Sequence, residues 1–199
     1  MTDDVQQGSK REAIVAAAYS ALLRWGLPSL SYDKIAEEGQ LSRQLIKYYF
    51  PDSEQLMLAL CDRIAASYRD GLVQLVREAE GKDRLNIFFD FYFDLLEASP
   101  KPRDDQVYDA LLSLATSSES IRENLRSQYT LIQQVLSHEL QVTYPELGPE
   151  ECAELGYLFV CLMYGHWKMV ASLGLDEERR FTTRDAVDRL LASYLEGSA

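Results

Sequence analysis

The sequence predicts an all-helical protein with no β-sheet. Apolar residues recur at intervals of three and four along most of the 199 residues, and this spacing places them on one face of an α-helix. Gly and Pro residues divide the periodic segments into lengths typical of helices. The sequence lacks the alternation of apolar and polar residues that marks a half-buried strand. We therefore expect a chain built entirely from packed helices.

The charge distribution restricts how such a chain could contact nucleic acid. Its net charge is -12, whereas nucleic-acid-binding proteins are usually basic. Residues 1–60 carry 6 Lys and Arg against 8 Asp and Glu, and the remaining residues carry 14 against 24. The acidic excess therefore belongs to residues 61–199, which would repel phosphate. Any contact with DNA is expected through the N-terminal region alone.

Cysteine usage and hydropathy indicate the compartment. Cys61, Cys152 and Cys161 show no C-x-x-C spacing, so neither a disulfide framework nor a zinc site is indicated. The first residues, MTDDVQQGSK, are acidic and polar and do not resemble a signal peptide. The longest apolar run, Gly156 to Gly165, is too short to span a bilayer. We expect a cytoplasmic protein with no membrane partner, associated with the nucleoid if it binds DNA.

The N-terminal region is predicted to hold a small three-helix domain. Residues 1–8 are expected to form a disordered tail. The first helix follows directly and ends at Gly26. Ser31 and Ser42 have the hydroxyl groups that suit the N-caps of two further short helices. Residues 9–52 therefore predict a helix-turn-helix domain with its own core.

Residues 31–50 have the pattern of a helix, a tight turn and a second helix. Gly39 suits a left-handed exit from the first of them. If Leu41, Ile46 and Phe50 face inward, the helical period places the polar residues of the second helix on its outer side. Arg and Lys donors pair there with guanine O6 and N7, Gln pairs with adenine, and a leucine can touch a thymine methyl group. The residues concerned are Arg43, Gln44, Leu45 and Lys47.

The stretch GQLSRQLIKYYFPDSEQLMLAL resembles the recognition helix and the following helix of the TetR (tetracycline-repressor) family of bacterial transcriptional regulators. The resemblance covers Lys10 to about Leu60 by motif, and the rest of the chain by helical layout. It implies base contacts from Arg43, Gln44 and Lys47. It also implies phosphate contacts from Ser31, Tyr48 and Tyr49, and Ser42 and Leu45 complete the predicted DNA-binding set.

Four positions depart from the family pattern. Gln40 stands where a glycine is usual, so the turn needs an adjusted backbone, and Gly39 is the expected compensation. Ser53 stands where a phosphate-binding lysine is common, which implies weaker contact with the DNA backbone. Leu45 and Lys47 replace a frequent threonine and a frequent tyrosine, so the preferred DNA sequence does not transfer from the family.

Residues 53–199 are predicted to form a ligand-binding and dimerisation domain. Its helices are expected near residues 53–80, 83–98, 105–116, 118–142, 149–173 and 182–195. The aromatic residues of this part are typical either of an ordinary core or of a pocket for a small-molecule effector, and composition leaves both open. The resemblance favours the pocket, for which we predict Phe88, Phe91, Tyr92, Tyr108, Tyr129, Met163, His166 and Trp167.

The last two predicted helices expose more apolar surface than one small domain can cover, which favours pairing with a second copy. The resemblance implies the same, because in the TetR family the last two helices of each protomer form a four-helix dimer interface. The predicted interface residues are Leu158, Leu162, Val187, Leu190, Leu191, Tyr194 and Leu195.

No arrangement of residues indicates catalysis. The sequence contains no Gly-rich phosphate loop and no G-x-S-x-G motif, and His138 and His166 lack metal-binding spacing. Asp90, Asp94 and Glu97 share one helical face, and we expect that face to be solvated. We therefore expect no catalytic residue, no metal and no cofactor.

The observations together predict a ligand-responsive, dimeric DNA-binding regulator, most simply a repressor. Two recognition helices, residues 42–50 of each copy, would dock in successive major grooves of a near-palindromic operator. Two alternatives stay open. One is a helical small-molecule-binding or interaction protein with a weakened DNA head, motivated by Gln40, Ser53 and the negative charge. The other is an all-α enzyme, for which the sequence offers no candidate site.

Overall fold

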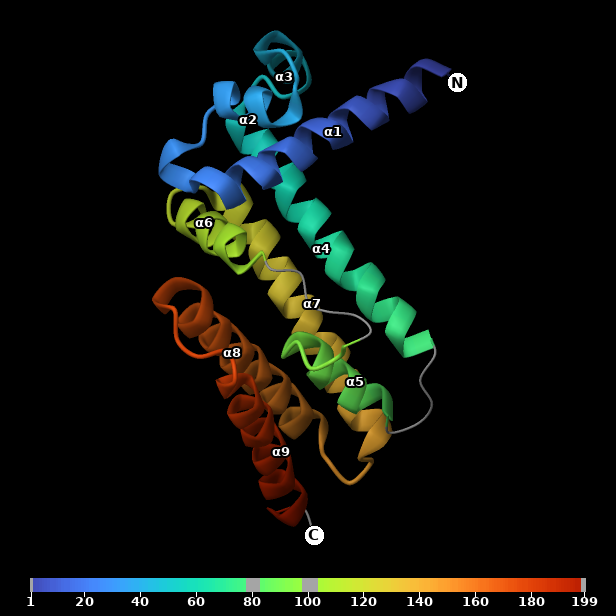
Figure 1. The fold of residues 1–199 in the computed structure, drawn as a ribbon. Coiled ribbons are helices and arrows are strands. Elements are labelled where there is room, and N and C mark those ends of the chain that lie inside the picture. Colours follow the sequence, from blue (N-terminus) through green and yellow to red (C-terminus); the bar gives the residue numbers. More distant parts are fainter. Residues whose placement is uncertain (1, 78–82, 98–103, 198–199) are drawn as a thin grey trace. The chain divides into compact units, whose positions relative to one another are not determined.

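The structure is a computed structural model, and it describes residues 2–77, 83–97 and 104–197. All regular elements in these ranges are helical (Figure 1), which confirms the predicted all-α class. They are α1 (Thr2–Trp25), the 3-10 helix η1 (Leu27–Ser29), α2 (Tyr32–Gly39), α3 (Arg43–Tyr49), α4 (Ser53–Arg77), α5 (Asp83–Tyr92), α6 (Asp105–Ala115), α7 (Glu119–Thr143), α8 (Pro149–Leu173) and α9 (Arg179–Gly197).

The chain divides into two compact units. The head unit comprises residues 1–66 and 104–125, and the body unit comprises residues 67–103 and 126–199. The predicted boundary after residue 52 falls inside the head unit. The reason is tertiary, because α6 packs against α1 and the first half of α4 stays with the same unit.

The head unit has a continuous apolar core. Residues with no exposed surface come from α1, α3 and α4 and from the end of the recognition segment: Ile14, Ala18, Ile46, Phe50, Leu56 and Leu60. α1 begins at Thr2, where the sequence predicted a disordered tail. The least favourable residue for a helix in that stretch is Gly8, and a single glycine costs about 1 kcal/mol in a helix without breaking it.

The turn between α2 and α3 differs from the expected one. Gln40, and not Gly39, adopts the left-handed conformation, with φ of 51° and ψ of 41°. Gly39 instead permits a close approach, because a Cβ atom there would lie 2.7 Å from the Cβ of Ala17 on α1. Gly39 is therefore needed for packing between helices, and Gln40 carries the strained backbone.

Aromatic rings form the core of the body unit. Phe88 and Phe159 lie with ring centroids 5.6 Å apart, and Phe159 also contacts Phe93 at 5.9 Å. The indole Nε1 of Trp167 donates a 2.8 Å hydrogen bond to the carbonyl of Tyr92, which ties α8 to the end of α5. Figure 1 shows α8 and α9 side by side, and these helices are in contact.

α5 ends at Tyr92, whereas the sequence predicted a helix to Ala98. Asp94 adopts a left-handed φ of 56°. The amide of Leu95 donates to the Asp90 carbonyl at 2.9 Å, and the Asp94 amide donates to the Phe91 carbonyl at 3.2 Å. This pair of bonds is a Schellman motif, which usually requires glycine at the left-handed position. Because this position holds an aspartate, the sequence lacks the glycine that usually signals such a helix end.

The remaining helix bounds lie close to those predicted. α4 begins at Ser53 and α8 runs from Pro149 to Leu173, as expected. α9 begins at Arg179, three residues before the predicted start. The predicted end of the fourth helix, near residue 80, lies outside the described residues.

Candidate nucleic-acid interface

α3 is fixed at both ends by local hydrogen bonds. The hydroxyl of Ser42 accepts a 3.1 Å bond from the amide of Leu45, so Ser42 is the predicted N-cap. At the other end, the hydroxyl of Tyr32 on α2 donates to the carbonyl of Phe50 at 2.8 Å. Burial, followed by the charge of Asp52, raises the pKa of Tyr32. α3 is therefore held rigidly against α2.

The inner and outer sides of α3 follow the predicted period. Ile46 and Phe50 are fully buried, while Arg43, Gln44 and Lys47 are exposed. Leu45 and Tyr49 are half-buried, and the ring of Tyr48 is 72% exposed and meets Tyr49 edge to face at 5.2 Å. The outer side of α3 therefore carries two cationic side chains, one amide and one exposed phenol. The helix itself contains no acidic residue.

The α2 and α3 N-termini are brought together at the edge of this surface. Ser31 is the exposed N-cap of α2 and accepts a 3.3 Å bond from the amide of Lys34. Asp33, in the same first turn, accepts hydrogen bonds from the guanidinium of Arg43. The structure therefore places Ser31 and Arg43, both predicted from sequence, near one another. Sequence reasoning did not single out Asp33.

Arg11 adds a third cation to Arg43 and Lys47 at the interface. Its guanidinium carbon lies 4.2 Å from the centroid of the Phe50 ring, a cation–π contact between α1 and the end of the recognition segment. Its side chain is exposed beside α3. The basic pair formed by Lys10 and Arg11 in an acidic chain was the only sequence signal for it.

The predicted pocket residues are divided between the two units. Seven of the eight belong to the body unit, and Tyr108 belongs to the head unit. Phe88, Phe91 and Tyr92 are buried among other rings, with Phe88 and Tyr92 centroids 5.0 Å apart. His166 and Trp167 meet edge to face at 4.8 Å. Met163 is buried and Tyr129 half-buried, its ring 6.2 Å from that of Tyr164.

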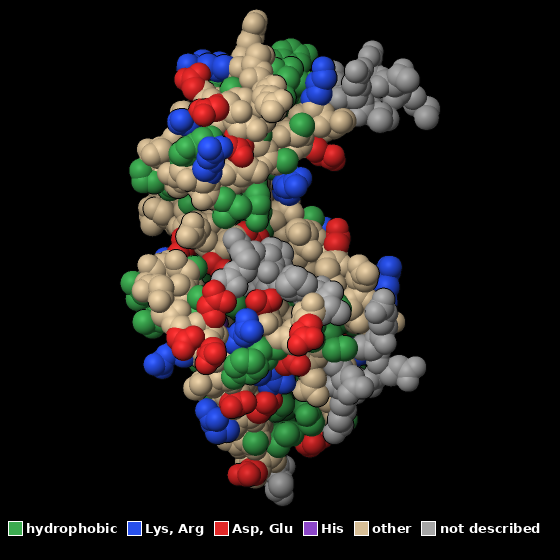
Figure 2. All heavy atoms as spheres, viewed as in Figure 1, with side chains coloured by type: hydrophobic (Ala, Val, Ile, Leu, Met, Phe, Trp, Pro, Cys, Tyr) green, Lys and Arg blue, Asp and Glu red, His purple; other side chains and the backbone are tan. Residues whose placement is uncertain are grey.

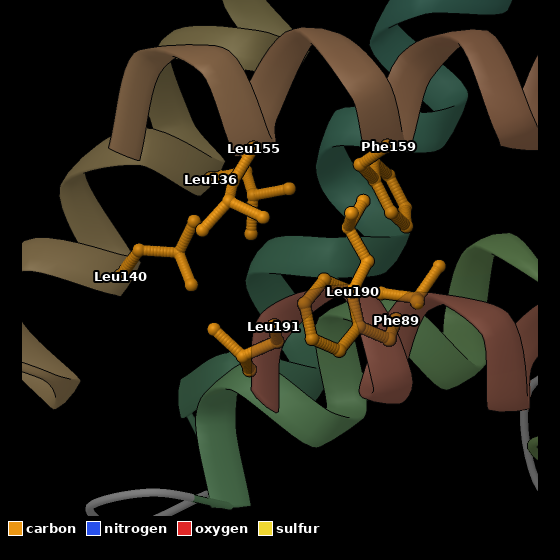
Figure 3. Close-up of a pocket in the computed structure, with 8 residues that line it drawn as sticks. Phe89, Leu136, Leu140, Leu155, Phe159, Leu190 and Leu191 are labelled. Atoms are coloured by element: carbon orange, nitrogen blue, oxygen red, sulfur yellow. The ribbon is translucent and has the colours of Figure 1, made fainter. Parts of the chain in front are cut away.

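A small apolar hollow lies elsewhere in the body unit, between α5, α7, α8 and α9 (Figure 3). The space it offers to the centre of a water molecule is only about 10 Å³, far below the usual volume of a ligand pocket. Its lining residues are Phe89, Leu136, Leu140, Leu155, Phe159, Val187, Leu190 and Leu191. Three of the predicted dimer-interface residues therefore turn toward the interior of their own protomer.

The remaining predicted interface residues are partly accessible. Leu158, Leu162, Tyr194 and Leu195 are each half-buried in the single chain. Around α8 and α9, acidic and basic side chains are interspersed on the face shown in Figure 2, with no large patch of one sign.

Two acidic residues expected to be solvated are instead paired. Asp90 accepts a 2.8 Å bond from Nε of Arg184, and Asp94 lies 3.4 Å from Nη1 of Arg180. The Arg184 side chain is only 10% exposed. The expectation of a solvated face is therefore wrong for Asp90 and Asp94, because α9 lies against this side of α5, and it holds for exposed Glu97.

No group of three or more potential metal ligands occurs within the described residues. In the same residues, no helix is long and apolar enough to cross a membrane.

The head unit contains a helix-turn-helix whose second helix, α3, has an exposed outer side. Two curated relatives are regulators named for this motif. The chain is 24% identical over 171 residues to the HTH-type transcriptional regulator BetI of Escherichia coli O17:K52:H18, covering 84% of this chain and 85% of the relative. It is 25% identical over 178 residues to BetI of Escherichia coli K12, covering 87% and 89%. No family model matches the chain.

Solved structures share the fold. A TetR transcription regulator from Haloarcula marismortui has a TM-score of 0.80 at 19% identity, covering 94% of this chain and 98% of that one. A protein from Saccharomonospora viridis, assigned as a transcriptional regulator and crystallised with choline, has a TM-score of 0.78 at 18% identity, covering 93% and 96%. The predicted resemblance to the TetR family is confirmed: the chain shares the fold of TetR-family regulators and is similar in sequence to BetI.

Proposed function

We propose that the protein represses transcription by binding a near-palindromic operator as a dimer, with α3 of each copy in the major groove. The observation that carries the proposal is the outer side of α3. Arg43, Gln44 and Lys47 are exposed there, and the opposite side of the helix is buried through Ile46 and Phe50. These three side chains are donors suited to base edges. Ser31, Tyr48 and Tyr49 are proposed to bind phosphates around them.

Selection from a random pool of double-stranded DNA with the purified protein tests this function. We expect one enriched sequence with two half-sites about one helical turn apart. Arg43→Ala should abolish or strongly weaken binding to the selected sequence, because a bidentate contact to guanine is worth about 1–3 kcal/mol. An unchanged gel shift for this variant would show that α3 is not the helix that contacts the bases.

The dimer is proposed to form through the outer side of α8 and the adjoining half-buried residues of α9. Large apolar side chains are exposed along α8, including Tyr157, Met169 and Leu173. Gly165 lies among them, and a Cβ atom there would meet nothing within 4 Å. A glycine on an apolar helix face allows a second helix to approach closely. Leu158, Leu162, Tyr194 and Leu195 would then be covered by the partner.

The effector is proposed to be a small organic cation. The choline bound to the Saccharomonospora viridis relative supports this class, and so does the ring-rich core of the body unit, since aromatic faces attract quaternary ammonium groups. The rings now pack on one another, with Tyr68 and Tyr92 stacked at 6.4 Å. Binding therefore requires side-chain rearrangement. Effector and operator affinities must then be reciprocally coupled.

Calorimetric titration with choline tests the effector class, and 3,3-dimethyl-1-butanol provides the matched control because it has the same shape without the charge. We expect choline to bind and to weaken operator binding, with the neutral alcohol much weaker in both. Equal binding of the two compounds would assign the site to apolar ligands, and no binding of either would exclude this class.

The alternative of a weakened DNA head is tested by the salt dependence of binding to random DNA. Ser53 lacks the charge that a lysine would supply, and its neighbours in the chain, Asp52 and Glu54, are acidic. If the head unit binds DNA through several phosphate contacts, its affinity for random DNA falls steeply as the salt concentration rises. A flat dependence would favour a binding or interaction protein.

A further inference from the structure

Asp33 binds the side chain that is proposed to read DNA. Nη1 of Arg43 donates to Oδ2 of Asp33 at 2.9 Å and to Oδ1 at 3.2 Å. Asp33 lies in the first turn of α2, and Arg43 is the first residue of α3 after its cap. The ion pair is open to solvent, with the two side chains 55% and 67% exposed. It therefore lies on the surface that would face DNA.

The pairing engages one nitrogen of the guanidinium and leaves the others available. Both carboxylate bonds come from Nη1, and the Arg43 side chain makes no other hydrogen bond within the described part of the chain. A guanidinium has a rigid, planar set of five donors. Its Nε and Nη2 edge can therefore pair with guanine O6 and N7 while Nη1 stays on Asp33.

Resting on the proposed function, we propose that Asp33 is a specificity-determining residue that positions Arg43 for base readout. The carboxylate limits the rotamers of a long side chain, so less conformational entropy is lost when Arg43 binds a base. The same negative charge disfavours a phosphate at Arg43. Asp33 therefore lowers affinity for DNA of any sequence and raises preference for the base pair that Arg43 contacts.

The ion pair with Asp33 distinguishes Arg43 from the other hydrogen-bond donors on the outer side of α3. Gln44 and Lys47 are exposed and have no recorded hydrogen bond to an acid among the described residues. Glu37 supplies a matched control for charge, because it lies on the same helix as Asp33 and is 58% exposed. Its partner is Lys34, at 2.9 Å, and not a residue of α3.

The experiment makes two measurements on the wild type, Asp33→Ala and Glu37→Ala. The first is the ratio of the affinities for the selected operator and for an operator changed at the base pair where Arg43→Ala loses its preference. The second is the affinity for random DNA at several salt concentrations. We expect Asp33→Ala to lower the preference at that base pair about 2- to 5-fold, the range for an exposed ion pair. It should bind random DNA more tightly, with a salt slope steeper by up to about 0.9, one more phosphate contact.

Glu37→Ala should tighten binding to random DNA without changing preference at that base pair. In an Arg43→Ala background, Asp33→Ala should no longer change preference at any position. Thermal unfolding followed by circular dichroism confirms that each variant is folded before its ratios are compared.

An unchanged preference in Asp33→Ala, or an equal loss in Glu37→Ala, overturns the inference. The selected sequences distinguish a wrong function from a wrong role for Asp33. If the wild type enriches no sequence from the random pool, the proposed function is wrong. If the wild type enriches a sequence and Asp33→Ala enriches the same one with the same stringency, only the role of Asp33 is wrong.

Discussion

At the scale of single residues, Gln40 carries the backbone strain of the helix-turn-helix. Its left-handed conformation is unfavourable for a residue with a Cβ atom. Gln40→Gly should therefore stabilise the protein by about 0.5–1 kcal/mol, after allowance for the greater freedom of glycine in the unfolded chain. The free energy of unfolding in urea measures this. Gly39→Ala is the matched control and should destabilise, because its new methyl group meets Ala17.

The two neighbours also show what sequence can predict at this scale. The caps Ser31 and Ser42 were correctly predicted, since a cap depends on residues three positions away. The left-handed position was predicted at Gly39 and lies one residue later, at Gln40. Any glycine before a new helix suggests a left-handed exit, and only the position of α1 reveals that Gly39 is required for packing.

At the scale of elements, Arg184 joins α9 to α5. Its side chain is 10% exposed, donates to Asp90 and Asp188, and lies 4.8 Å above the Phe89 ring. Arg184→Ala should destabilise the protein by about 2–3 kcal/mol, because Asp90 would be left half-buried without its cation. Urea unfolding provides the measurement.

Asp188→Asn is the control for this ion pair. The Asp188 side chain is 54% exposed, so its loss should cost less than about 1 kcal/mol. Equal costs for the two variants would contradict the larger cost expected from leaving half-buried Asp90 without its cation. This contact was beyond sequence reasoning, since 94 residues separate Asp90 from Arg184.

The start of α4 is joined to the start of α7 by Glu54. Its carboxylate accepts hydrogen bonds from the hydroxyls of Ser118 and Ser120. The bond from Ser118 has the larger effect, and the two bonds together lower the pKa of Glu54 below its ordinary 4.5. A lowered folded-state pKa contributes stability above pH 4.5 that is lost as the pH falls through the lower folded-state value. The stability difference between the wild type and Glu54→Gln should therefore shrink between about pH 6 and pH 3. Urea midpoints across this range measure it, and a constant difference would contradict it.

At the scale of the whole molecule, the sequence predicted the helical class and most helix bounds because these depend on local periodicity and breakers. The division into units was less accessible. α6 lies some 80 residues after α1 in the chain, and only tertiary packing places it in the head unit. The same limit applies to the interface residues. Val187 and Leu191 have the spacing of an exposed apolar face, yet they line a hollow inside the protomer.

The proposed dimer interface can be tested at Gly165 on α8. Gly165→Glu should give monomers, because the protomer has open space at Gly165 while a partner helix packed there does not, and a buried unpaired carboxylate is costly. Val142→Glu on α7, 61% exposed in the protomer, is the control and should remain dimeric by sedimentation. Cys161, exposed on the same side of α8, should react with a maleimide quickly in the monomeric variant and slowly in the wild type. A dimeric Gly165→Glu protein would place the interface away from the outer side of α8.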